Sequence, residues 1–109
     1  MLKASREADR RPLHIMVRGR VKSRAIYADL IDISEGGCKL RASLGFADIG
    51  DRVTIRLNGI NAPLGKVVWI DNKVAGVAFE SPMHIAMLDY LCKTVNDASF
   101  DQQQRMHQI

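Results

Sequence analysis

Hydrophobic and polar residues alternate with a period of two at the start of the chain, and this alternation is typical of half-buried β-strands. Leu13, Ile15 and Val17 fall on one side of such a strand, and the residues between them fall on the other. Five further segments have strand character: residues 26–33, 38–41, 53–57, 65–70 and 74–79. Turn-forming residues such as Gly36-Gly37 and Asn58-Gly59 interrupt the pattern. The alternation therefore predicts six short strands.

A helical periodicity replaces the alternation after residue 81. Apolar residues recur there at spacings that place them on one helix face: Ile85, Leu88, Leu91, Cys92 and Val95. Ser81 and Pro82 are residue types that often begin a helix, so we expect Ser81 to be its N-cap. Met83 and Met87 are expected to pack beside this face. Six strands and one terminal helix predict an all-β fold, a small six-stranded antiparallel β-barrel with a C-terminal α-helix that covers one open end.

The length of 109 residues allows one domain, and we find no internal repeat. We interpret residues 1–12 as a flexible basic arm, residues 13–96 as the barrel and helix, and residues 97–109 as a polar tail or an extension of the helix.

No apolar run approaches the ~20 residues of a membrane-spanning helix, and the N-terminus lacks the apolar segment of a secretory signal. Cys38 and Cys92 lie far apart and outside any CxxC pair, which argues against a disulfide or a zinc site and favours the cytoplasm.

Positive charge is concentrated near the N-terminus. Residues 1–24 hold eight basic and two acidic side chains, whereas the rest of the chain holds eight basic and ten acidic ones. Six of the eight N-terminal basic residues are arginine, whose planar fork suits phosphate groups and base edges. This distribution indicates an anion or nucleotide site, although a solvated basic tail would have the same composition.

The residue patterns of common enzymes are missing. His14, His84 and His107 are scattered and belong to no metal-ligand pattern. Ser34 is outside a GxSxG elbow, and no phosphate-binding GxxxxGK[ST] loop is present. We therefore expect a binding protein that has no catalytic activity, no metal and no cofactor.

Four short motifs follow one another in the chain. They are an RxxxR motif at residues 6–10, a DxSxxG motif at 32–37, a GxVxW strand at 65–69 and a GVxF strand at 76–79. Together they resemble the PilZ domain, the bacterial receptor module for cyclic di-GMP, over roughly residues 6–95. Because only five residues precede the first arginine, we expect a stand-alone, single-domain member that acts as an adaptor.

The resemblance implies a set of residues that bind cyclic di-GMP: Arg6, Arg10, Arg11, Asp32, Ser34, Gly36 and Gly37. Arginine forks match the O6 and N7 acceptors of guanine and the phosphate oxygens, whereas a carboxylate and a hydroxyl can accept from the N1–H and N2–H donors. Simpler roles remain open for these residues. The arginines could be solvated, Asp32 and Ser34 could cap a turn, and Gly36 could serve the turn alone.

We therefore expect a cytoplasmic cyclic di-GMP receptor that changes conformation on binding and signals to an unidentified partner protein, for example in motility or biofilm formation. Its expected state is a monomer or weak dimer. One alternative is a PilZ-like interaction subunit that binds no nucleotide and acts in pilus or motility assembly. A barrel that binds single-stranded RNA is a further alternative, which the low aromatic content of 6% disfavours. We expect Trp69 to lie in the core.

Overall fold

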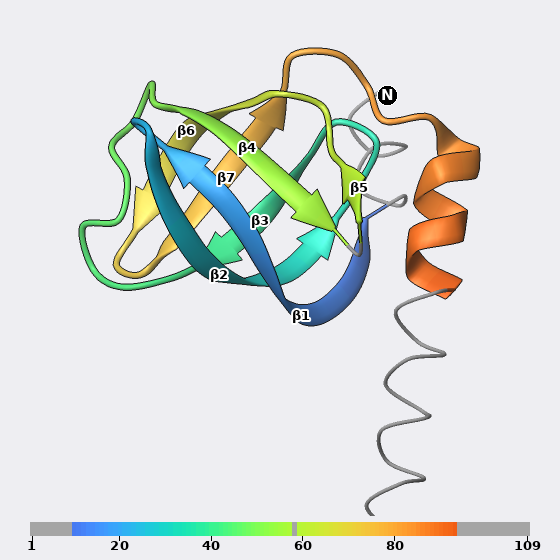
Figure 1. The fold of residues 1–109 in the computed structure, drawn as a ribbon, viewed down its shortest axis with the longest axis horizontal. Helices are drawn as coiled ribbons and strands as arrows, with labels where there is room; N and C mark the ends of the chain where they lie inside the picture. Colours follow the sequence, from blue (N-terminus) through green and yellow to red (C-terminus); the bar gives the residue numbers. More distant parts are fainter. Residues whose placement is uncertain (1–9, 58, 94–109) are drawn as a thin grey trace, which may run out of the picture.

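Seven strands make up one antiparallel sheet in the computed structural model of the protein, which describes residues 10–57 and 59–93 (Figure 1). The strands are β1 (Arg11–Val21), β2 (Arg24–Ile33), β3 (Gly37–Arg41), β4 (Arg52–Leu57), β5 (Ile60–Asn61), β6 (Gly65–Asp71) and β7 (Val74–Phe79). A helix follows them, of which residues 85–93 are described.

The sheet closes on itself. Its strand order is β1-β2-β3-β7-β6-β4-β5, and β1 also pairs with β4, so six strands form a closed antiparallel barrel. The short strand β5 is an addition that pairs only with β4 among the described strands. The predicted six-stranded barrel with a C-terminal helix is confirmed. The predicted strands match the six barrel strands, whereas β5 was not predicted because two residues show no periodicity.

The core follows from the alternation seen in the sequence. Inward-facing aliphatic side chains from β1, β2, β3 and β4 are almost wholly buried, among them Val21, Leu30, Leu40 and Val53. Burying one such side chain contributes about 1.5–3 kcal/mol, so this cluster is the main source of stability. Closure also leaves the barrel strands without free edges, which removes sites for aggregation.

Strand β1 begins at Arg11, two residues earlier than the sequence predicts. Its pairing with β2 starts at Arg11 and Pro12 and then shifts register before Ile15, and His14 lies in the left-handed region with φ 56°. The exposure alternates from Arg11 to Val17 across this bulge, but Arg11 is a charged residue on the inward side, so the hydrophobic alternation in the sequence starts only at Leu13.

The helix begins later than predicted, and Ser81 is not its cap. His84 takes that place, because the Ala86 N–H donates to His84 Nδ1 at 3.1 Å and the Leu88 N–H donates to the His84 carbonyl at 3.0 Å. Residues 82–84 are held outside the helix because the Met83 N–H donates to the Glu35 carbonyl at 2.8 Å and the Met83 side chain is buried.

The helix packs on the barrel through a narrower face than the periodicity predicts. Leu88 and Leu91 are buried and Cys92 is half-buried, but Ile85 is 41% exposed and Met87 also lies on the surface. The delayed start of the helix accounts for the exposure of Ile85, which occupies its first turn. Val95 lies outside the described residues, as do residues 1–9 of the predicted arm and the whole of residues 97–109.

Candidate functional site

A cavity of about 260 Å³ opens on the barrel where the β2–β3 turn meets β6 and β7. Four of the seven residues predicted from the sequence line it: Arg10, Ser34, Gly36 and Gly37. The other walls come from β3, β6 and β7, and they include Cys38, Lys39, Val68, Trp69 and Gly76. The sheet order places β3, β7 and β6 side by side, so residues about forty positions apart in the sequence line one cavity.

Asp32 holds the positive charges at this cavity in place. Its carboxylate is largely buried, with 12% of the side chain exposed, and its Oδ1 accepts a hydrogen bond from Arg10 Nη1 at 2.7 Å. Lys39, its partner across the β2–β3 ladder, places Nζ 3.5 Å from Oδ2. A carboxylate has about four acceptor positions, so Asp32 can position both cations and still accept a further donor.

The β2–β3 turn is fixed by hydrogen bonds on both sides. The Ser34 N–H donates to the Gly37 carbonyl at 2.8 Å, and the Ser34 hydroxyl donates to the same oxygen at 3.4 Å. The carbonyls of Glu35 and Gly36 accept from the backbone N–H groups of Met83 and Phe79, each at 2.8 Å. Ser34 thus has the local turn-capping role that the sequence left open, and the turn is bound to β7 and to the segment before the helix.

The two glycines of the turn differ in their surroundings. A Cβ at Gly37 would lie 2.1 Å from the Val77 carbonyl oxygen, so only glycine lets β3 approach β7 this closely. A Cβ at Gly36 would meet no atom within 4 Å. Gly37 is therefore required by the strand packing, whereas Gly36 leaves open space beside the cavity.

Trp69 lies on the surface, and its predicted place in the core is wrong. A register shift between Val67 and Trp69 in the β6–β7 ladder interrupts the alternation, so Val68 and Trp69 both face outward. The Trp69 side chain covers Gly76, where a Cβ would lie 2.1 Å from the indole Nε1. The indole remains 39% exposed and forms part of the cavity wall. An aromatic surface of this kind can stack on a base.

Cys38 is the cavity residue with the most perturbed acidity. Burial, and after it the negative charge of Asp32, raises the pKa of the Cys38 thiol from 9.0 to about 12, while Arg10 acts in the opposite direction. The thiol is therefore protonated and unreactive at neutral pH. Cys38 and Cys92 are both free, and the described part of the chain contains no cluster of three or more His, Cys, Asp or Glu residues that could hold a metal ion.

Of the predicted residues that the structure describes, Asp32 and Arg11 do not line the cavity. Asp32 is connected to it through its hydrogen bond to Arg10. Arg11 instead donates from Nη1 to Asp89 Oδ1 of the helix, and this hydrogen bond raises the pKa of Arg11. Arg6 lies outside the described residues.

Sequence reasoning missed Lys39 and Trp69 as cavity residues. The alternation of β3 was a usable signal for Lys39, since it places Lys39 on the face opposite the buried Cys38 and Leu40. No pattern in the sequence indicated the bulge that exposes Trp69.

The fold and this cavity define a small β-barrel binding module with an arginine and a carboxylate beside an aromatic wall. A model of the PilZ domain matches residues 4–92, which is most of the chain, so the protein belongs to the PilZ domain family. PilZ domains are binding and adaptor modules. A search of curated proteins gave no match. Within the described residues, none of the helical structure is long and apolar enough to cross a membrane.

Proposed function

We propose that this protein is a cyclic di-GMP receptor without catalytic activity and that the cavity beside the β2–β3 turn holds one guanine of the ligand. The observation that carries the proposal is the meeting of Arg10, Ser34 and Gly36 at one cavity with an exposed indole, where Arg10 is hydrogen-bonded to Asp32. The membership in the PilZ family supports the same ligand.

The polar groups of the cavity are complementary to guanine. Arg10 offers a donor fork for O6 and N7, and it is already oriented by its 2.7 Å hydrogen bond to Asp32. Asp32 offers acceptor positions for N1–H and N2–H on the other edge of the base. Because one carboxylate both orients Arg10 and accepts from the base, the two contacts support each other.

The remaining walls fit the flat faces and the phosphates. The exposed indole of Trp69 provides a stacking surface, and stacking of a base on an aromatic side chain is worth about 1–3 kcal/mol. Lys39 places a second cation at the cavity for a phosphodiester oxygen. The open space at Gly36 allows the ligand to approach the backbone of the turn.

Arg6 supplies the second guanidinium of the RxxxR motif in this proposal. Arg6 lies four positions before Arg10, and a fully extended chain spans about 14 Å over that distance. This reach is enough to bring Arg6 to a ligand that Arg10 already contacts. Closure of the arm over the ligand would create or hide a surface that a partner protein recognises.

Calorimetric titration of the full chain with cyclic di-GMP tests the proposal. We expect saturable binding, and we expect Arg10→Ala to weaken it at least tenfold, because the ligand loses the donor fork. Arg24→Ala is the matched control, since it removes an exposed arginine that lies outside the cavity. Equal affinity in the two variants would contradict the assignment of Arg10. An absence of binding to the wild-type chain at micromolar concentrations would favour the nucleotide-independent interaction subunit.

A further inference from the structure

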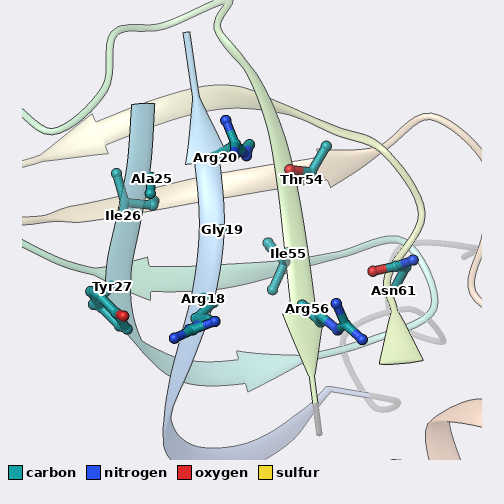
Figure 2. Close-up of a pocket in the computed structure, with 10 residues that line it drawn as sticks. All are labelled: Arg18, Gly19, Arg20, Ala25, Ile26, Tyr27, Thr54, Ile55, Arg56 and Asn61. Atoms are coloured by element: carbon teal, nitrogen blue, oxygen red, sulfur yellow. The ribbon is translucent and has the colours of Figure 1, made fainter. Parts of the chain in front are cut away.

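A second cavity, of about 500 Å³, lies on other strands of the barrel and shares no lining residue with the proposed guanine site. It is formed by the outer faces of β2, β1 and β4 with the short strand β5 at its side (Figure 2). Its size falls within the range of small-molecule sites, about 300–1,000 Å³.

Four side chains cross this face in one row. The strand registers pair Tyr27 with Arg18, Arg18 with Arg56, and Arg56 with Asn61. Figure 2 shows these four side chains along one side of the cavity, with Arg20 farther along β1. Neighbouring strands are about 4.8 Å apart, so the row spans about 14 Å, which leaves room for a small molecule with both a phosphate and a ring.

The arginines of this cavity lack an acidic partner in the part of the chain that the structure describes. Within residues 10–57 and 59–93, no carboxylate lies within ion-pair distance of Arg18, Arg20 or Arg56, and the lining contains no acidic residue. Other cations of the barrel do have partners, for example Arg52 with Glu80 and Arg41 with Asp29. Like charges directly opposite on neighbouring strands destabilise a sheet. The pairing of Arg18 with Arg56 therefore costs stability, and a bound anion would offset this cost.

Two further features favour a phosphate ester that carries a planar ring. The ring of Tyr27 is exposed, at 62% of the residue surface, and the Arg18 guanidinium lies over it with Cζ 5.6 Å from the centroid. Gly19 lets β1 and β4 approach closely between the arginines, since a Cβ there would lie 2.5 Å from the Thr54 carbonyl oxygen. Arginine forks bind phosphate oxygens in a bidentate manner, and an aromatic ring stacks on a base.

We propose that the row Tyr27, Arg18, Arg56 and Asn61, together with Arg20, binds a phosphate-bearing small molecule of mononucleotide size at a site separate from the cyclic di-GMP cavity. Arg18 and Arg56 hold the phosphate, Tyr27 contacts the ring, and the Asn61 amide completes the polar contacts. A concave cavity favours this ligand over an acidic protein segment, which needs a wider and flatter surface.

The test is an NMR titration of the full-length ¹⁵N-labelled protein with pyrophosphate, ribose 5-phosphate, AMP and GMP. We expect saturable shifts of the Gly19 and Ile55 amides, with a nucleotide bound more tightly than ribose 5-phosphate. Arg56→Gln should weaken binding at least tenfold without lowering the melting temperature, because it also removes the repulsion from Arg18. Lys66→Gln is the control, because it removes the same charge from an exposed position outside both cavities.

Three results would overturn the proposal. They are an absence of saturation by any of the four probes at millimolar concentration, equal affinities in Arg56→Gln and Lys66→Gln, and tighter binding of octauridylate or an octaglutamate peptide than of either nucleotide. Cyclic di-GMP distinguishes the two sites. Its affinity should be unchanged in Arg56→Gln, and a loss there would show that this cavity is not separate. Failure of the cyclic di-GMP titration alone leaves the nucleotide result standing.

Discussion

Substitution of Asp32 by asparagine tests the central contact of the proposed guanine site. The change keeps the size of the side chain but removes the charge that orients Arg10 and attracts Lys39. Two unit charges about 4 Å apart attract each other by about 4 kcal/mol at an effective dielectric constant of about 20, and by about 1 kcal/mol in water. The Arg10 side chain is 38% exposed, so solvent screening and the desolvation of the carboxylate bring the net value near the lower figure. We expect Asp32→Asn to lower the free energy of unfolding by about 1 kcal/mol.

A double-mutant cycle isolates this pair. Urea unfolding of Asp32→Asn, Arg10→Gln and the double variant should give a coupling free energy of about 1 kcal/mol, since each single change removes the same interaction. The matched control is Asp29→Asn, which removes a more exposed carboxylate from the same strand. A coupling below about 0.3 kcal/mol, the limit of additivity for independent sites, would show that the pair contributes nothing in solution.

The same variant measures the role of Asp32 in binding. The asparagine side chain would keep one acceptor oxygen but lose the charge, and hydrogen bonds to charged groups are worth about 1.5–3 kcal/mol. The affinity for cyclic di-GMP should therefore fall about ten- to a hundredfold in calorimetry, while the Asp29→Asn control keeps the wild-type affinity. If Asp32→Asn bound cyclic di-GMP as tightly as the wild type, the guanine would not contact this carboxylate.

Other predictions follow from the surroundings of the cavity. Gly37→Ala should destabilise the protein by about 1–3 kcal/mol in urea unfolding, because the new Cβ would overlap the Val77 carbonyl oxygen. Gly36→Ala, where a Cβ meets no atom, should change the free energy of unfolding by less than about 0.5 kcal/mol. Equal losses in the two variants would contradict the packing argument. Trp69 is the single tryptophan, so a titration with cyclic di-GMP should change the intrinsic fluorescence at the same ligand concentration that half-saturates the protein in calorimetry. Binding without any change in fluorescence would show that the ligand does not contact the indole. The pKa of Cys38 is raised to about 12 in the folded protein, because the folded state favours the protonated thiol. The stability that the buried thiol contributes is therefore complete below about pH 9, and it is lost as the pH rises toward 12. Between pH 8 and pH 10 the wild type should therefore lose about 1 kcal/mol more stability than Cys38→Ala, and parallel losses would refute the shift.

The barrel was predictable because its strands alternate. A half-buried strand must place every second side chain in the core, and residues such as Val53 and Leu40 record that requirement directly in the sequence. The turn glycines were recognisable for a similar reason, since a position like Gly37 cannot carry a side chain. These features depend on local rules that any reader of the sequence can apply.

The errors occurred where tertiary contacts override the local rules. The bulge in β6 turns Trp69 outward although its sequence context is that of a core residue. A backbone hydrogen bond from Met83 to the β2–β3 turn delays the helix, so His84 rather than Ser81 caps it. Neither contact leaves a periodic signal, because each depends on a segment that is distant in the chain.

The candidate site was predictable in composition but not in geometry. The RxxxR and DxSxxG motifs indicated the residue types, and Arg10 and Ser34 do line one cavity. The motifs did not distinguish Arg10 from its neighbour Arg11, whose side chain pairs with Asp89. That distinction depends on where the helix packs, and the helix comes about seventy residues later.

The hydrogen bond between the Glu35 carbonyl and the Met83 N–H has a mechanical consequence. It attaches the tip of the β2–β3 turn to the residue that directly precedes the helix cap. A displacement of the Glu35 carbonyl must therefore either break this hydrogen bond or move Met83 and the first residues of the helix with it.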